Sequence, residues 1–288
     1  MINFTKMEGL GNDYIYIDCT KKTEQEINNI SKLASKMSDR HFGIGSDGLI
    51  LICKSDIADY KMKMYNQDGS QAEMCGNGIR CVGKFIYDKG LSNSKHLTIE
   101  TLAGIKTLDL IVEKNKVSNI TVNMGKPIMQ EKLIPCIADT KNENKLINNK
   151  ISHVIVNALD KTFDFTCVSM GNPHAITIVK NLDNFDVKKY GKIIECDKHF
   201  PKKTNVEFIE IIDDYTIKMR VWERGAGETL ACGTGASASV VACILNGVIK
   251  NDKEIKVKLL GGDLHIKWDD YVYMTGPARI VFEGIYNQ

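Results

Sequence analysis

Residues 74–78 read Met-Cys-Gly-Asn-Gly, and residues 231–235 read Ala-Cys-Gly-Thr-Gly. The two cysteines of this repeated Cys-Gly-x-Gly motif, Cys75 and Cys232, lie 157 positions apart. Each copy ends a strand-like run and begins an apolar, helix-like run, over residues 76–87 in the first case and 233–245 in the second. We therefore expect each thiol at a helix N-terminus, where free backbone N–H groups and the helix dipole stabilise a thiolate and bind anions.

The repeat extends beyond the cysteines. Residues 60–66 (YKMKMYN) align with residues 217–223 (IKMRVWE) at the same spacing, and both alternate apolar and polar side chains as a half-buried strand does. Upstream, residues 10–14 (LGNDY) match residues 170–174 (MGNPH). Ordered landmarks repeated only twice predict two homologous domains rather than a solenoid.

Boundaries and local elements follow from the same pattern. The chain crosses from one half to the other near residues 125–127 (Gly-Lys-Pro), and the last strand-like run, at 278–283, is expected to return to the first half. The predicted domains are residues 1–124 plus 277–288, and residues 125–276. A first helix is expected from Thr23, with Glu26 completing a capping box, and the polar residues 139–150 predict a surface loop.

Composition limits the class of protein. The chain has 288 residues, 43% hydrophobic and 26% charged, and a formal net charge of +2, so no strong field for nucleic acid or an anionic membrane is indicated. No secretory signal and no apolar run near the ~20 residues of a membrane span are present. We expect a cytoplasmic protein that binds neither nucleic acid nor membrane.

Nine cysteines, an odd number, favour reduced thiols over a secreted disulfide framework. No Cys-x-x-Cys pair occurs, so no metal site is expected. Apart from Cys75 and Cys232, the cysteines are expected to be small buried hydrophobes.

A pair of opposed thiols suits one reaction in particular. Inverting an α-carbon requires removal of its hydrogen on one face and reprotonation on the other, and a thiolate base with a thiol acid meets this need without an electron-sink cofactor. The two glycine turns at the helix N-termini could hold the α-carboxylate through backbone N–H groups and stabilise the carbanion-like transition state.

Six segments make the expectation specific. They are residues 9–13 (GLGND), 65–70 (YNQDGS), 75–81 (CGNGIRC), 171–174 (GNPH), 204–207 (TNVE) and 222–235 (WERGAGETLACGTG). Together, in this order and over nearly the whole chain, they resemble the diaminopimelate epimerases. The resemblance implies cofactor-independent interconversion of LL- and meso-diaminopimelate, in lysine and peptidoglycan precursor biosynthesis, by a homodimer.

The resemblance also implies a fold and a set of site residues. The fold is α/β (α+β), with two pseudo-symmetric domains, each a mostly antiparallel sheet wrapped around a central helix, and an active site in the cleft between them. Cys75 and Cys232 fall on the acid/base pair, with Cys232 taking the proton from the LL-substrate; His174 falls on the residue that tunes the first thiol and Glu223 on the one that tunes the second. The positions that match substrate contacts are Asn12, Asn66, Asn172, Asn205, Glu223 and Arg224, and the carboxylate-holding turns are Gly76-Asn77 and Gly233-Thr234.

The chain departs from the family pattern at one position: many members carry Gln where this chain has Gly48, so any role of this position must be through the backbone.

Two alternative functions remain open. A proline-type racemase shares the two-cysteine plan, although Glu223 and Arg224 supply a charged distal site that a monocarboxylate does not need. A thiol-based redox or ligand-binding protein without turnover is the other. Related isomerases that use a carboxylate in place of the cysteine pair are excluded by the two thiols.

Overall fold

The computed structural model describes residues 1–21, 27, 29–144 and 149–287. Contacts divide the chain into two compact units, which are described separately. Unit 1 consists of Met1–Asn123 and Thr275–Gln288, and unit 2 consists of Met124–Met274.

The elements of unit 1 are ten strands and two helices among its described residues. In chain order they are β1 (Ile2–Gly9), β2 (Asn12–Cys19), α2 (Ile30–Ser38), β3 (Gly48–Cys53), β4 (Tyr60–Asn66), β5 (Gln71–Ala72), α3 (Gly76–Asp88), β6 (His96–Thr101), β7 (Gly104–Glu113), β8 (Lys116–Gly125, which runs across the boundary) and, from the chain end, the last part of β18 (Val272–Pro277, which also runs across the boundary) and β19 (Arg279–Tyr286). The last strand, β19, pairs antiparallel with β1. The C-terminal segment is thereby part of the sheet of unit 1.

Unit 2 contains the remaining elements. They are β9 (Thr140–Asn144), β10 (Asn149–Ala158), β11 (Lys161–Ser169), β12 (Pro173–Ile178), the short 3-10 helix η1 (Leu182–Asn184), α4 (Val187–Ile194), β13 (Asn205–Asp213), β14 (Thr216–Glu223), β15 (Gly227–Thr229), α5 (Gly233–Leu245), β16 (Ile255–Leu259), β17 (Gly262–Trp268) and β18 (Val272–Pro277). The strands predicted at residues 60–66 and 217–223 are confirmed as β4 and β14.

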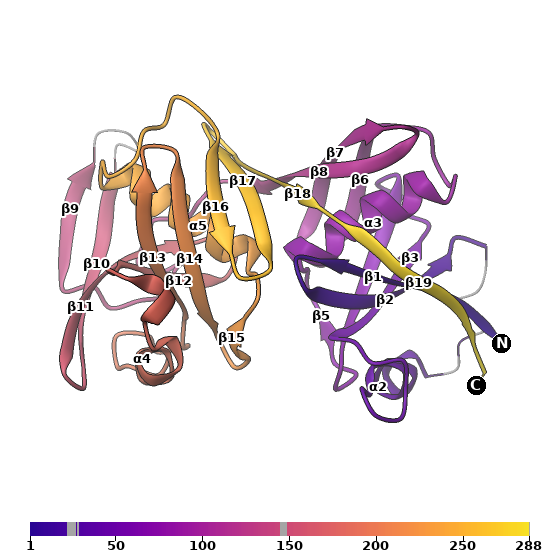
Figure 1. The fold of residues 1–288 in the computed structure, drawn as a ribbon, viewed down its shortest axis with the longest axis horizontal. Coiled ribbons are helices and arrows are strands. Elements are labelled where there is room, and N and C mark those ends of the chain that lie inside the picture. The colour runs from indigo at the N-terminus through magenta and orange to yellow at the C-terminus, as the bar shows by residue number, and fades with distance from the viewer. Residues whose placement is uncertain (22–26, 28, 145–148, 288) are drawn as a thin grey trace. The chain divides into compact units, whose positions relative to one another are not determined.

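The two units repeat one pattern of strand pairing (Figure 1). In unit 1, β1–β2, β3–β4, β4–β5 and β6–β7 are antiparallel, while β2–β3 and β4–β6 are parallel. In unit 2, β11–β12, β13–β14, β14–β15 and β16–β17 are antiparallel, while β12–β13 and β14–β16 are parallel. The predicted α+β class with two pseudo-symmetric halves is confirmed.

A central helix lies in each unit. In unit 1, α3 packs against β1, β2 and β7, and in unit 2, α5 packs against β11, β12, β13 and β17. Every residue of α5 except Thr234 is buried, as expected of a helix that is apolar on all sides. The helices predicted from the two Cys-Gly-x-Gly motifs are therefore the buried centres of their sheets, which fixes where the two cysteines stand.

Two local predictions have different outcomes. The predicted first helix is confirmed over α2, which buries Leu33, Ala34 and Met37, but it begins later than predicted, at Ile30. Ile27 is not helical, and Asn29, with a left-handed backbone (φ 58°), is the N-cap. Thr23 and Glu26 themselves lie outside the described residues. The surface loop predicted at residues 139–150 is wrong over most of its length, because β9 and the start of β10 pair antiparallel there. Backbone hydrogen bonds hold such a pair together without an apolar sequence. Residues 145–148 of that segment also lie outside the described residues.

Burial of the cysteines follows the expectation with one exception. Cys19, Cys53, Cys81, Cys136, Cys167 and Cys243 are buried, whereas Cys196 is exposed.

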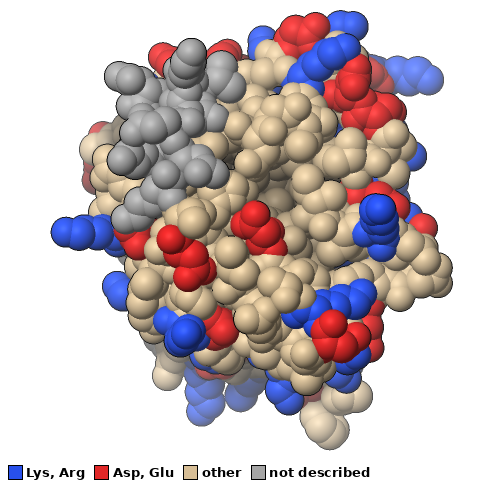
Figure 2. Space-filling model, turned by 90° about the vertical axis from the view of Figure 1, so that its left-hand side faces the viewer, with Lys and Arg blue, Asp and Glu red and all other residues tan. Residues whose placement is uncertain are grey.

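No helix in the described part of the chain is long and apolar enough to cross a bilayer. On the face shown in Figure 2, basic and acidic side chains are interspersed, in keeping with the nearly balanced net charge.

Candidate functional site

Cys75 is the N-cap of α3. Its backbone is extended (φ −123°, ψ 122°), and its Sγ accepts a hydrogen bond from the backbone N–H of Gly78 at 3.4 Å. On its other side the thiol donates to Oδ1 of Asn12, the first residue of β2, at 3.1 Å. The half-buried thiol thus lies between the first turn of a helix and an amide side chain from a strand.

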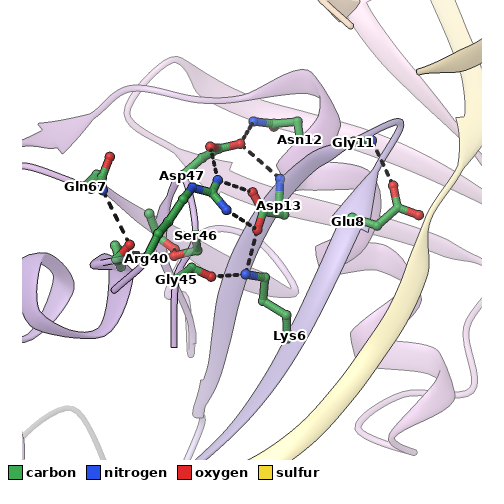
Figure 3. A network of polar contacts seen from close by, with 12 residues as sticks. Lys6, Glu8, Gly11, Asn12, Asp13, Arg40, Gly45, Ser46, Asp47 and Gln67 are labelled. Atoms are coloured by element: carbon green, nitrogen blue, oxygen red, sulfur yellow. Dashed lines mark hydrogen bonds and ion pairs between the residues drawn. The ribbon is translucent and has the colours of Figure 1, made fainter. Parts of the chain in front are cut away.

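The orientation of Asn12 is set by a charged network (Figure 3). Nδ2 of Asn12 donates to Oδ2 of Asp47 at 2.7 Å. Arg40 pairs with both Asp13 and Asp47 at 2.8 Å, and Lys6 pairs with Asp13 at 2.6 Å. Because a carboxylate only accepts hydrogen bonds, Asp47 holds the NH₂ group of Asn12, and the carbonyl oxygen of Asn12 must face Cys75.

The same network determines the charge of Asp13. Burial raises the pKa of Asp13, but hydrogen bonds and charges from Arg40 and Lys6 outweigh it, so that this pKa lies below its ordinary value. Asp13 is therefore an anion at neutral pH, and the network around Asn12 keeps two carboxylates and two cations together.

The other predicted residues of unit 1 lie close by along the chain. Asn66 ends β4, opposite Gly48 of β3, and its Nδ2 donates to Oγ of Ser70 at 3.0 Å. Gly76 and Asn77 form the first turn of α3, where the side-chain oxygen of Asn77 accepts from Nη1 of Arg80 at 3.1 Å. Both Gly76 and Asn77 lie in the first turn of the helix, whose backbone N–H groups have no acceptor within the helix and point toward an anion at its N-terminus.

Gly48 has no room for a side chain. A Cβ placed there would overlap the carbonyl oxygen of Tyr65 and approach Cε1 of Tyr14 to 2.8 Å. Glycine is required here by close packing of β3 against β4, and any contribution of this position must come from its backbone.

Cys232 is the N-cap of α5, with nearly the backbone conformation of Cys75 (φ −124°, ψ 110°). It is buried, and its Sγ lies 3.5 Å from Oγ1 of Thr234. Burial raises the pKa of the Cys232 thiol well above its ordinary value, and the carboxyl groups of Glu223 and Glu207 raise it further. The thiol form of Cys232 is favoured in this environment.

Two predicted residues of unit 2, Asn172 and His174, lie around the start of β12. Nδ2 of Asn172 donates to Oγ1 of Thr234 at 3.3 Å, and Nε2 of His174 lies 3.0 Å from Oδ1 of Asn172. Nδ1 of His174 lies 2.6 Å from Oε1 of Glu207, and both of these side chains are fully buried. The structure therefore connects His174 to the Cys232 side of unit 2; its predicted role toward Cys75 stays a prediction.

The remaining predicted residues surround the ends of β13 and β14. Nδ2 of Asn205 donates to the carbonyl of Pro173 at 2.8 Å, and Oδ1 of Asn205 accepts from the backbone N–H of Arg224 at 2.9 Å. Glu223 accepts a hydrogen bond from Oγ1 of Thr229. Gly233 begins α5 beside Thr234. Asn205 thus joins the first residue of β12 to the segment that carries Glu223 and Arg224.

Sequence reasoning missed Glu207 and Asp47. Glu207 stands between Val206 and Phe208 in a strand whose first five residues are all buried, and a charged residue inside an apolar run of that kind is a detectable signal. Asp47 lies in a glycine-rich segment that gives no such signal. Its importance follows only from its hydrogen bond to Asn12.

A cavity of about 500 Å³ in unit 2 is separate from these residues. Its lining includes Phe163, Phe185, Cys243 and Asn246. Cys243 and Asn246 stand at the C-terminal end of α5, whereas Cys232 caps the N-terminal end. A helix of that length extends roughly 20 Å at 1.5 Å per residue, so the cavity does not adjoin the thiol.

Comparison with known proteins agrees with these motifs. The family model for diaminopimelate epimerase matches residues 4–130 and 166–281. A diaminopimelate epimerase of Methanococcus maripaludis is 55% identical over 286 residues, covering 98% of this chain and 99% of the relative, and one of Acetivibrio thermocellus is 54% identical over 287 residues, covering 98% of each.

Solved structures show the same fold at low identity. A Bacillus anthracis phenazine biosynthesis protein of the PhzF family superimposes with a TM-score of 0.67 at 20% identity, covering 99% of each chain. A hydroxyproline epimerase from Agrobacterium vitis has a TM-score of 0.65 at 12% identity, covering 98% of this chain and 91% of that one. These two likenesses concern the fold, while the identity to curated relatives decides the family. The chain belongs to the diaminopimelate epimerase family and is an amino-acid epimerase.

Proposed function

We propose that this protein interconverts LL- and meso-diaminopimelate without a cofactor: of the two thiols Cys75 and Cys232, one removes the α-proton as a thiolate and the other delivers its own proton to the opposite face of the α-carbon. The observation that carries the proposal is the pair of cysteine N-caps, which have nearly equal backbone angles on the two helices of an internal repeat. Membership of the family supports the substrate. The pathway that this reaction serves is, on the same basis, lysine and peptidoglycan precursor biosynthesis.

The chemistry requires both thiols at one carbon. A thiolate removes the α-proton from one face, the electron pair stays on the α-carbon and its carboxylate, and a thiol delivers a proton to the opposite face. The enzyme ends the turnover with the two protonation states exchanged. The first turns of α3 and α5 offer backbone N–H groups at Gly76, Asn77, Gly233 and Thr234 for the α-carboxylate.

The two thiols need different protonation states at the start of each turnover. The environment of Cys232 favours its thiol form, which supports an asymmetric resting pair. By family resemblance, Cys232 is the base toward the LL-isomer and Cys75 the base toward the meso-isomer. His174 and Glu223 are proposed, on the same resemblance, to tune the first and the second thiol.

Specificity for a substrate with two amino-acid ends is proposed to come from Asn12, Asn66, Asn172, Asn205, Glu223 and Arg224. Arg224 is the only cation in this set, and a guanidinium suits a bidentate contact with the distal carboxylate. Arg224→Lys keeps the charge but loses the fork, so we expect kcat/KM to fall by about tenfold or more. An unchanged kcat/KM would remove Arg224 from the distal site.

Exchange of the α-hydrogen in D₂O is the direct test. We expect deuterium to enter diaminopimelate with the purified protein, with activity unaffected by EDTA and no pyridoxal absorbance. Exchange with proline and not with diaminopimelate would indicate a proline-type racemase instead. No exchange with either amino acid would indicate a thiol protein without turnover.

Oxidation offers a second test of the thiol pair. If the two sulfurs approach one carbon, mild oxidation should join them, abolish activity, and be reversed by a thiol reductant. Peptide mapping that finds Cys75 and Cys232 both unmodified in oxidised, inactive protein would contradict the arrangement.

The family resemblance also leads us to infer a homodimer in the cytoplasm. Sedimentation velocity at enzyme concentrations used in the assay tests the dimer, and a monomer with full activity would contradict it.

A further inference from the structure

Five side chains of unit 2 form a continuous hydrogen-bonded series that ends on Cys232. The successive distances are 2.6 Å from Oε1 of Glu207 to Nδ1 of His174, 3.0 Å from Nε2 of His174 to Oδ1 of Asn172, 3.3 Å from Nδ2 of Asn172 to Oγ1 of Thr234, and 3.5 Å from that hydroxyl to the sulfur. Glu207 is the one member for which neither the motifs nor the family resemblance gives a role. It is also the one carboxyl group of the series, and it is fully buried.

The series has a direction. Asn172 donates its NH₂ group to Thr234, so its carbonyl oxygen accepts from Nε2–H of His174. Because the oxygen of Thr234 accepts from Asn172, its own hydrogen can point at the sulfur of Cys232. Each group then donates to the next, and the final hydrogen bond stabilises the thiolate form of Cys232.

The opposite direction of hydrogen bonding is also chemically possible, and it would remove the hydrogen bond that the sulfur of Cys232 accepts from Thr234. If the ring of His174 carried its proton on Nδ1, then Nε2 would accept, the amide of Asn172 would turn over, and Thr234 would donate to Asn172 instead of to the sulfur. What decides between the two directions is the group that faces Nδ1. That group is Glu207.

The environment of Glu207 favours its neutral form. Oε2 of Glu207 is buried and accepts no hydrogen bond from any described residue, which is costly for a carboxylate and far less so for the carbonyl of a carboxylic acid. The ionisable groups that face it are His174 on β12, Glu223 on β14 and Cys232 at α5. Burial raises the pKa of Glu207 and the charge of Glu223 adds to this, against the opposing effect of His174.

A neutral Glu207 has a second consequence at the thiol. The carboxyl group packs directly under the first turn of α5, since a Cβ added to Gly235 would lie 2.6 Å from Oε1. A carboxylate there disfavours the thiolate of Cys232. A carboxylic acid in the same place adds no charge.

We propose that Glu207 is a positioning residue that, as a neutral acid, donates its proton to Nδ1 of His174 and thereby directs the hydrogen bonds of Asn172 and Thr234 toward the thiolate of Cys232. This rests on the proposed function for the part that concerns turnover. The orientation of the series does not depend on it.

The state of His174 can be read directly in the intact protein. We suggest ¹⁵N-histidine labelling, with His174 assigned by the His174→Gln variant, and ring nitrogen shifts recorded near pH 7. The expected result is a neutral ring with Nε2 protonated and Nδ1 unprotonated. A ring with both nitrogens protonated would mean a Glu207 carboxylate beside an imidazolium, and a ring protonated on Nδ1 alone would reverse the series; either result overturns the proposal.

Two substitutions of Glu207 separate the effect of its hydrogen-bond donor from the effect of its volume. Glu207→Gln keeps shape and a donor toward Nδ1, so we expect the same ring signature and a kcat/KM within about threefold of the wild type. Glu207→Leu keeps the volume but has no donor, so we expect a mixture of both ring forms and a kcat lower by about tenfold, with a smaller change in KM. Glu210→Gln is the matched control, because Glu210 lies on the same strand and bonds instead to the backbone N–H groups of Asn181 and Leu182.

The outcomes are distinguishable from failure of the proposed function. If diaminopimelate shows no α-hydrogen exchange in the wild type, the ring signature still decides the proposal about Glu207. If exchange occurs but Glu207→Leu retains the wild-type ring signature and kcat, Glu207 does not position the series. A loss of about tenfold or more in Glu207→Gln would show that the charge of Glu207 is required, and would also overturn the proposal.

Discussion

The N-termini of α3 and α5 have nearly the same backbone conformation but different electrostatic environments. Cys75 and Cys232 have almost the same φ and ψ, and each is followed by a buried helix of 13 residues. Around α3 the fully buried Arg80 donates to the carbonyl of Gly76, and Lys6 and Arg40 neutralise the carboxylates beside Asn12. Around α5 the charges that act on Cys232 are those of two carboxyl groups, Glu207 and Glu223, which raise the pKa of its thiol.

The difference shows how one repeated motif can give two unequal thiols. The Cys-Gly-x-Gly turn provides each sulfur with the same helix N-terminus, and neighbouring strands then provide different charges and hydrogen-bond partners. Two-base catalysis requires that inequality, because one sulfur must be protonated while the other is not.

The largest effect is expected from removing either sulfur. Cys75→Ser and Cys232→Ser should each lower epimerisation by about 10³-fold or more, since each deletes one of two essential proton-transfer groups. With a β-halogenated substrate analogue, which needs only one base for elimination, each variant should process a different stereoisomer. The measurement is halide release for every stereoisomer, and processing of one and the same stereoisomer by both variants would end the two-face assignment.

A glycine in each first turn gives a matched comparison of packing. Gly235→Ala places a Cβ 2.6 Å from Oε1 of Glu207, whereas Gly78→Ala places one 2.9 Å from Cδ1 of Ile50, the end of a flexible side chain. We expect Gly235→Ala to lower the free energy of unfolding by about 2 kcal/mol, in the range of overpacking, and Gly78→Ala to lower it by about 1 kcal/mol or less. Urea unfolding monitored by circular dichroism measures both, and equal losses would contradict the tighter packing at α5.

The charged network beside Cys75 can be tested through Asp47. Asp47→Asn lets the amide of Asn12 turn over, so that its NH₂ group can face the sulfur, and we expect kcat/KM to fall by about tenfold. Asp18→Asn is the control, because Asp18 lies on the same strand as Asn12 but bonds to Thr20. If the two variants had the same activity, the orientation of Asn12 would not matter for turnover.

The smallest effect concerns stability at alkaline pH. Burial raises the pKa of Cys81 and of Cys243 to about 12 from the usual 9.0, and raises that of Cys232 as well. Between these values the folded state keeps protons that the unfolded state has lost, so the free energy of unfolding should fall as pH rises from 9 toward 12. Cys232→Ser should make that fall shallower in urea unfolding measured across this pH range. An identical slope would contradict the strongly buried thiol at α5.

Much of the fold follows from local pattern. The strands β4 and β14 and the helices α3 and α5 are readable from period-two alternation and from apolar runs after glycine turns, because these patterns depend on neighbours along the chain. The hairpin of β9 and β10 is not readable in that way. Its polar residues favour a loop locally, and it is the pairing of β9 with β10, and of β10 with β11, that makes them extended.

The sequence by itself determined the repeat, the two cysteines at helix N-termini, and the family resemblance carried by its ordered motifs. Only the tertiary structure decided what each sulfur faces. The sulfur of Cys75 faces Asn12, which is held by Asp47, and the sulfur of Cys232 faces Thr234, at the end of the series that begins at Glu207. The physical reason is that a helix N-terminus is a local property of a few consecutive residues. The charges and the direction of the hydrogen bonds around that N-terminus depend on side chains from separate strands, which come together only when the sheet closes around the helix.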